Sequence, residues 1–485
     1  MAGIGIRLNR IYSKNTVTTN LLGFGYSIVV TIAPMVLVIA AVILMQWLLG
    51  FSHLEYASRE LFSCTILYVF IFAMLCNSPL NAVLSRYLSD VIYREKFEDI
   101  MPCYYVGLLL TTVLDLAVSV PFLVREHTVG NVSLTYVIMT YVAFMSLSYV
   151  FYSMIYLSIC KAFRQQSLFF LIGMATSVAL SMILVKAMDV EETYAMLSSL
   201  AIGFLLTASL EFSLIRSYFS TSSGRFGEIF RFFAKNWQLI LTNFIYTLGL
   251  YLHNFIFWTG SEHTIVANTF VCYTSYDLAT CIAMFTNISA TVIFVTGVEM
   301  NFHDKYKAYT EAVIGGRGMD IKNGKERMFR QLFDELMHLV RIQFIISTAL
   351  FFIFMFALPY FGMGGLVMQI YPSLAAGYFI LFIMYAAIIF LYYFNDLNGA
   401  LMTALTFAAV TAGMTVVSMH LSPMWYGLGL VAGAFAGWCI AYIRIRILEK
   451  RLDYHVFCEG SIMQRGHGRR PSDKVYSVEN VNLKR

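Results

Sequence analysis

The chain is poor in charged residues. Asp, Glu, Lys and Arg make up 13% of its 485 residues, whereas hydrophobic residues make up 59%. A soluble domain carries about 25% charged residues, so this composition excludes a water-soluble globular protein. The net charge of +5 does not indicate a nucleic-acid partner. The basic residues flank apolar stretches, where anionic lipid headgroups attract them.

Motifs that carry catalytic or metal chemistry are also missing. The eight cysteines form no C-x-x-C pair, and the sequence has no H-E-x-x-H and no G-x-S-x-G. Most of the cysteines fall inside apolar runs, where a thiol acts as a small apolar filler. We therefore expect no enzyme activity, no cofactor, no metal site and no disulfide framework.

Long apolar runs dominate the sequence instead. A helix needs about 20 residues to cross a hydrocarbon core of about 30 Å, and twelve runs are long enough. The pattern predicts an all-α polytopic membrane protein with about twelve transmembrane helices. The runs cover 21–49, 61–84, 104–124, 134–158, 167–187, 195–215, 237–258, 268–298, 342–361, 371–394, 399–420 and 424–443.

The basic residues alternate between the two sides of the predicted membrane. All but three of the 33 Lys and Arg residues lie before the first run, after the last run, or in the even-numbered gaps between runs. The three exceptions are Arg59, Arg125 and Lys186. Because cytoplasmic loops retain Lys and Arg, both termini are predicted to be cytoplasmic.

The runs divide into two sets of six. We expect an N-terminal bundle over 1–215, a cytoplasmic linker helix on the inner leaflet over 216–236 and a C-terminal bundle over 237–459. A long cytoplasmic loop at 299–341 belongs to the second bundle, and a basic disordered tail covers 460–485. Two halves of six helices would be parallel repeats about an axis along the membrane normal, with transport sites between them near mid-membrane.

The linker prediction rests on helical periodicity. Phe226, Ile229, Phe230, Phe233 and Trp237 recur at helical spacing within a basic segment, which is typical of an amphipathic helix at a membrane surface. A similar apolar stripe precedes the ninth run.

Acidic residues inside apolar runs are candidate transport residues. Asp115, Glu211 and Asp277 lie in the third, sixth and eighth runs, and charge within hydrocarbon is costly. They would hold amino groups or a coupling ion in a cavity. The alternative is that they form hydrogen bonds between helices, which is the favoured interpretation for His253 and Asp396 near the ends of their runs.

The seventh run carries a polar stripe of Asn243, Thr247, Tyr251 and Asn254. Their spacing places amides and hydroxyls on one helix face over about 16 Å. Sugar hydroxyls need such mixed donors and acceptors. Bonding between helices is the alternative explanation.

Tyrosines recur every seven residues in the tenth run, and a straight helix keeps such residues near one face. Tyr378 and Tyr385 are the inner members of this ladder, and Tyr152 belongs to a shorter tyrosine cluster in the fourth run. Stacked rings could guide a sugar chain, or the rings could simply pack. No Lys or Arg lies in the middle of a run, which favours a neutral or cationic cargo over a lipid diphosphate.

Several segments resemble the PelG family of Pel exopolysaccharide export proteins. They include Arg86-Tyr-Leu-Ser-Asp-Val-Ile-Tyr, Gly297-Val-Glu-Met-Asn-Phe, Tyr393-Phe-Asn-Asp and Leu452-Asp-Tyr-His-Val-Phe, and the resemblance covers nearly the whole chain. It implies the multidrug/oligosaccharidyl-lipid/polysaccharide flippase superfamily, with two six-helix bundles around a central cavity. It also implies a multi-pass protein of the bacterial inner membrane.

The resemblance further implies the partners and the cargo. The partners would be a cytoplasmic glycosyltransferase and inner-membrane Pel subunits, and the cargo a partly deacetylated amino-sugar polymer. No residue roles come with it. Two alternatives remain: an ion-coupled exporter of drugs or lipid-linked oligosaccharides with the same architecture, or a non-transporting scaffold for the polysaccharide synthase.

Overall fold

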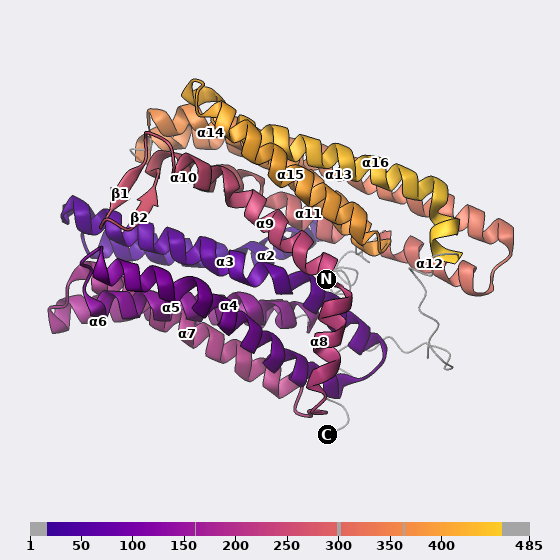
Figure 1. Cartoon of the computed structure of the whole chain (residues 1–485), viewed down its shortest axis with the longest axis horizontal. Coiled ribbons are helices and arrows are strands. Elements are labelled where there is room, and N and C mark those ends of the chain that lie inside the picture. Colours follow the sequence, from indigo (N-terminus) through magenta and orange to yellow (C-terminus); the bar gives the residue numbers. More distant parts are fainter. Residues whose placement is uncertain (1–16, 161, 298–301, 362–363, 458–485) are drawn as a thin grey trace.

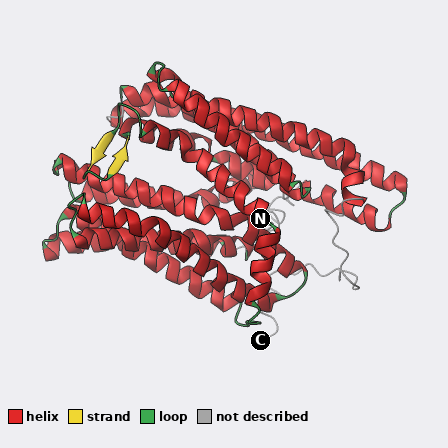
Figure 2. Cartoon of the chain, viewed as in Figure 1, coloured by secondary structure: helices red, strands yellow, loops and turns green. Residues whose placement is uncertain are grey.

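A computed structural model describes residues 17–160, 162–297, 302–361 and 364–457. The described chain is almost entirely helical (Figure 2). Its one hairpin pairs β1 (Thr264–Val266) with β2 (Phe270–Cys272) in antiparallel register. The all-α fold class is confirmed.

The helices fall into two halves that occupy opposite sides of the molecule in Figure 1. The first half contains α2 (Val17–Leu48), α3 (Tyr56–Tyr93), α4 (Ile100–Thr128), α5 (Leu134–Ile159), α6 (Phe163–Met188) and α7 (Glu192–Tyr218). The second contains α9 (Trp237–Phe257), α10 (Thr274–Asn287), α11 (Ser289–Gly297), α13 (Gly318–Ala357), α14 (Leu366–Tyr393), α15 (Leu397–Ser418) and α16 (Leu428–Phe457). The halves are joined by α8 (Phe226–Lys235), and α12 (His303–Gly315) precedes α13.

Ten helices in the described part of the chain are long and apolar enough to cross a membrane. The first predicted run coincides with α2, and the eighth is divided between α10 and α11. The multi-pass membrane architecture is therefore confirmed. The count of twelve spans and the cytoplasmic position of the termini stay predictions, and the predicted tail at 460–485 lies outside the described residues.

The two halves share one packing plan. In the first half α3 packs on α5, α5 and α6 pack on α7, and α2 packs on α6. In the second half the helices in corresponding positions repeat these contacts: α10 packs on α14, α14 and α15 pack on α16, and α9 packs on α15. Between the halves, α3 lies against α9 and α2 against α11, and this interface is called the seam below. The pattern is the one expected of two related bundles arranged as parallel repeats.

A repeated asparagine marks the same place in both halves. Asn77 of α3 donates through Nδ2 to the carbonyl of Ala73 at 2.9 Å and to that of Ser148 on α5 at 3.2 Å. Pro79 follows two residues later within α3, where its ring removes one backbone donor. The Ser78 hydroxyl donates to the carbonyl of Leu75 at 2.8 Å.

Asn287 makes the equivalent bonds in the second half. Its Nδ2 donates to the carbonyl of Ala283 at 3.1 Å and to that of Ala375 on α14 at 3.0 Å. Here the helix is interrupted, because α10 ends at Asn287 and α11 begins at Ser289. Two corresponding helices beside the seam therefore contain a proline or a break next to an asparagine that bonds to the corresponding neighbouring helix, α5 or α14.

Glycines bring α15 and α16 close together. Gly429, Gly433 and Gly437 are spaced four residues apart on one face of α16, and a β-carbon at Gly433 would lie 2.9 Å from the Phe407 carbonyl oxygen and from the Thr411 backbone nitrogen. Small residues at this spacing are the common means by which membrane helices pack closely.

The two predicted amphipathic stripes are helical. On α8, Ile229 and Phe233 are buried, whereas Phe226 and Phe230 are about half exposed. In the predicted loop at 299–341, α12 is followed by the first part of α13, whose Phe329 is buried in the core of the second half. The 40 residues of α13 then continue without interruption into the ninth apolar run.

Candidate transport site at the seam between the two halves

The polar stripe of α9 lies on the seam. Asn243 donates through Nδ2 to the carbonyl of Ser78 on α3 at 3.0 Å, and the Tyr251 hydroxyl contacts the Met74 sulfur at 3.1 Å. Thr247 is buried between these two positions along α9. The stripe thus occupies the interface where transport sites were expected. In this state the bonds of Asn243 and Tyr251 run between helices, as the alternative explanation also required.

An aromatic pair lies beside the stripe. The rings of Tyr246 on α9 and Tyr385 on α14 stack with centroids 4.6 Å apart and an interplanar angle of 24°. Both side chains are only partly buried. Sequence reasoning singled out Tyr385 but missed Tyr246, although its position three residues after Asn243 places it near the same helix face.

Tyr378 belongs to a buried cluster within the second half. The Tyr276 hydroxyl and His253 Nδ1 are 2.8 Å apart, and the Tyr378 and His253 rings meet edge to face at 6.3 Å. Among the described residues, neither His253 Nε2 nor the Tyr378 hydroxyl has a hydrogen-bond partner. Since buried polar groups are normally paired, this cluster retains two groups able to bond to a ligand or to water.

Asp277 and Asn254 come together at the start of α10. The Asp277 carboxylate accepts hydrogen bonds from Asn254 Nδ2 at 2.7 Å, from Trp258 Nε1 at 3.0 Å and from the Tyr273 backbone N–H at 3.1 Å. These donors satisfy both oxygens and fix the beginning of the helix. The local structure therefore provides a sufficient reason for a carboxylate at this position.

We expect Asp277→Asn to destabilise the protein. An asparagine amide has one oxygen, so its NH₂ group would face either the Asn254 amide nitrogen or the Trp258 and Tyr273 donors, depending on which position the oxygen takes. Such an unmet buried donor costs about 1–3 kcal/mol. The measurement is the melting temperature of purified protein in detergent, with the exposed Glu262→Gln as the control. Unchanged stability with reduced polymer secretion would instead assign Asp277 to the cargo.

The remaining predicted acids lie inside the first half. Asp115 on α4 and Glu211 on α7 are fully buried, and their carboxylate oxygens have no hydrogen-bond partner within the described chain. Glu126, in the last turns of α4, is also fully buried, and its carboxylate oxygens likewise have no hydrogen-bond partner in the described chain. Sequence reasoning missed Glu126 because the apolar run ends before it. The Ser148 hydroxyl and the Cys76 thiol lie beside Asp115, but a buried carboxylate without a cation is costly when ionised. These three groups are therefore available to a cation or a proton.

Tyr152 also lies away from the seam. Its hydroxyl donates to the carbonyl of Tyr104 at 2.8 Å and lies 3.0 Å from the Tyr156 hydroxyl. A β-carbon at Gly107 would lie 2.9 Å from Tyr152 Cζ. The ring thus fills the space between α4 and α5, and this arrangement supports a packing role.

Asp396, the other acid noted near the end of a run, is paired. Its carboxylate accepts from Arg444 Nε at 2.9 Å and from Arg444 Nη2 at 2.7 Å. It also accepts from the Gly399 backbone N–H at 3.0 Å, which caps α15. The paired geometry agrees with a structural role.

The halves touch at both ends of the seam. At the hairpin end, Tyr68 stacks on Trp258 with centroids 5.1 Å apart, and its hydroxyl donates to the Val271 carbonyl at 2.8 Å. At the other end, Arg86 Nη2 donates to Asn395 Oδ1 at 2.6 Å. A passage between the halves would therefore require at least one of these contacts to separate.

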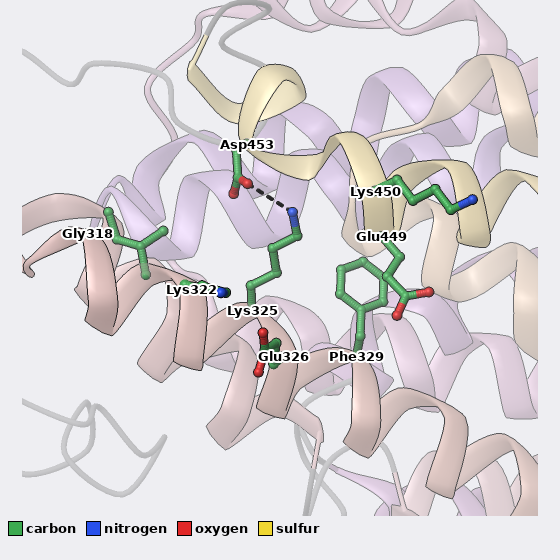
Figure 3. Close-up of a pocket in the computed structure, with 9 residues that line it drawn as sticks. Gly318, Lys322, Lys325, Glu326, Phe329, Glu449, Lys450 and Asp453 are labelled. Carbon is green, nitrogen blue, oxygen red and sulfur yellow. Dashed lines mark hydrogen bonds and ion pairs between the residues drawn. The ribbon is translucent and has the colours of Figure 1, made fainter.

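A separate pocket of about 550 Å³ lies between α13 and α16, beyond the apolar runs (Figure 3). Lys325 forms an ion pair with Asp453 at 2.9 Å across it. Lysines and acids line the pocket in equal number, which suits a polar protein surface better than a polyanion. The charged lining residues are Lys322, Lys325, Lys450, Glu326, Glu449 and Asp453.

A family model matches residues 1–457, and its description is "PelG: Putative exopolysaccharide Exporter (EPS-E)". The chain belongs to the PelG family. No curated protein matches it. The family and the fold together make this PelG chain a multi-pass membrane protein of an exporter family.

Solved transporters share the fold at low sequence identity. A MATE protein in the straight conformation has a TM-score of 0.59 and 12% identity, with 92% of this chain and 97% of that chain covered. An outward-facing multidrug resistance MATE family transporter of the MOP superfamily gives 0.56 and 13%, covering 88% and 96%. The Vibrio cholerae MATE transporter VcmN in the bent form gives 0.56 and 12%, covering 89% and 97%. The fold expected from the sequence is thereby confirmed.

Proposed function

We propose that this PelG chain exports a Pel-type, partly deacetylated amino-sugar polymer across the cytoplasmic membrane as a cytoplasmic glycosyltransferase extends it. The observation that supports this most is that amide and hydroxyl groups of α9 lie on the seam of an exporter-family fold, with an aromatic pair beside them in the second half. Asn243, Tyr251, Tyr246 and Tyr385 carry these groups.

Each of these groups suits a sugar chain. A pyranose has an apolar face that packs on an aromatic ring, and a tyrosine adds a polar tip to such a ring. The hydroxyls around the sugar would replace Ser78 as the partner of Asn243 and Met74 as the partner of Tyr251. Exchange of one bond for another keeps the energetic cost of opening the seam small.

The two asparagine positions suit a movement of one half against the other. Asn77 lies next to Pro79 of α3 and Asn287 next to the break between α10 and α11, and α3 and α11 border the seam. Bending at these points would let one half move against the other while each bundle stays packed. In this proposal Asp115 and Glu211, buried inside the first half, hold a coupling ion.

The end of the molecule that carries α12 suits a protein partner. There α12 and the adjoining ends of α13 and α16 project beyond the other helices (Figure 1). The charged pocket between α13 and α16 lies on this projection. We propose that it receives the glycosyltransferase or another Pel subunit, which would place the synthase near the seam.

We expect Tyr385→Ala to reduce secreted polymer about two- to tenfold, because loss of a ring contact worth about 0.5–1.5 kcal/mol lowers occupancy of the passage by that factor. Tyr385→Phe keeps the stack on Tyr246 and should retain most secretion. The measurement is polymer outside cells that carry the synthase but lack their own exporter. Tyr360→Ala, at a tyrosine 91% exposed, is the matched control.

Protein level and synthase activity are measured in the same cells. Normal secretion by Tyr385→Ala, with secretion lost on changes at Lys325 and Asp453, would favour the scaffold alternative. Export of a small cationic drug without the synthase, sensitive to Tyr385→Ala, would favour the multidrug alternative.

A further inference from the structure

Two cysteines face each other across the two halves. Cys64 lies on α3 and Cys272 on β2, and their sulfur atoms are 2.7 Å apart although 208 residues separate them in the sequence. Both side chains are buried. The first belongs to one bundle and the second to the hairpin of the other, so a bond between them would join the halves covalently.

The surroundings hold both sulfurs in place. Four residues along α3 from Cys64, the Tyr68 hydroxyl bonds to both the carbonyl and the N–H of Val271, next to Cys272. The Thr264 hydroxyl donates to the Cys272 carbonyl at 3.1 Å across the hairpin. The contact therefore belongs to a defined interface and not to a chance approach of two loops.

The predicted topology puts this contact on the extracytoplasmic side. β1 lies in the seventh gap and β2 directly follows it at the start of the eighth run, and the odd-numbered gaps are almost free of Lys and Arg. Disulfides form and persist in oxidising compartments such as the bacterial periplasm, and they are rare in the cytosol. The predicted oxidising compartment and the close approach of the two sulfur atoms therefore both favour a disulfide.

We propose that Cys64 and Cys272 form a disulfide bond that ties the hairpin end of the seam together. The two thiols give up two protons and two electrons to the disulfide of an extracytoplasmic thiol oxidoreductase, which is reduced to two thiols. An S–S bond of about 2.05 Å requires the sulfurs to approach by only about 0.65 Å. Because both thiols are buried, the exchange takes place before the hairpin packs on α3.

A zinc site is the competing assignment. The carboxylate of Glu60 and the two sulfurs lie within 4.8 Å of one another. Two thiolates at about 2.3 Å from a tetrahedral zinc would be about 3.8 Å apart, which is farther than the observed 2.7 Å. The sulfur positions therefore favour a direct bond.

The test uses full-length protein in native membranes, with a protease site inserted at the exposed Ser220–Ser222 segment between the halves. After cleavage, the two fragments should migrate together on a denaturing gel without reductant and separately with it. Cys64→Ser and Cys272→Ser should each release the fragments without reductant, whereas Cys103→Ser, at another buried cysteine, should not. Mass spectrometry of the wild-type protein should detect the linked peptides.

Fragments of the wild type that separate without reductant would overturn the proposal. One zinc ion per chain, with both thiols free to alkylation after denaturation, would assign the site to metal instead. The gel does not depend on polymer secretion, so its failure leaves the proposed export function untouched. A linked protein that secretes no polymer would count against that function alone.

Discussion

Gly433→Leu will abolish accumulation of the folded protein. A side chain at Gly433 meets the backbone of α15, because its β-carbon would lie 2.9 Å from both the Phe407 carbonyl oxygen and the Thr411 nitrogen. Backbone atoms of a packed helix cannot rotate aside, so α16 would have to move away from α15 along the whole glycine face. Overpacking of this kind costs about 1–3 kcal/mol, and occasionally more.

The chain offers a matched control on the partner helix. No atom lies within 4 Å of a β-carbon built at Gly413 of α15, so Gly413→Leu places the same side chain in open space. We expect it to leave the amount and melting temperature of the detergent-purified protein unchanged. Equal loss in both variants would mean that glycine acts here through helix flexibility and not through close packing.

Asn287→Leu will destabilise the protein more than Asn77→Leu. Both asparagines donate to a carbonyl on a neighbouring helix, but Asn287 Oδ1 also accepts from the Ser347 hydroxyl at 2.6 Å. The corresponding oxygen of Asn77 has no hydrogen-bond partner in the described part of the chain. Each buried polar group left unpaired costs about 1–3 kcal/mol. Asn77→Leu removes a donor from two oxygens of Ser148, whereas Asn287→Leu removes the acceptor of both the Ser347 hydroxyl and the Gln343 amide as well as a donor to Ala375.

The melting temperatures of both variants are compared in the same detergent. Asn81→Leu is the control for replacing an asparagine with leucine, because Asn81 is exposed on α3. Similar losses at 77 and 287 would show that the Ser347 bond contributes little. Stability unchanged in both would exclude these amides as supports of the helix around Pro79 and of the break between α10 and α11.

Much of the fold could be predicted because hydrophobic length and charge act locally. Apolar runs determined where helices lie, and the spacing of Asn243, Thr247 and Tyr251 determined the face of α9 that meets α3. The spacing of apolar residues could not show whether an apolar stripe packs against the protein core or lies on the membrane surface. Phe329 packs into the protein core, although a membrane surface would produce the same spacing.

The unpredicted features join residues that are distant in sequence. Asn77 and Asn287 are revealed as equivalent by their bonds to α5 and α14, because the residues around them differ. The Cys64–Cys272 contact depends on the hairpin folding back on α3. Trp258 joins Asp277 because the hairpin brings the end of α9 to the start of α10.

The length of α13 has a mechanical consequence. At 1.5 Å per residue its 40 residues form a rod of about 60 Å, and no proline interrupts it. One end of α13 helps form the charged pocket, and the other end lies beside η4 (Leu358–Phe361). The two ends therefore belong to one stiff helix. Force applied by a synthase at Lys325 would reach the far face of the membrane as a tilt of this helix, without any chain of side-chain rearrangements to relay it.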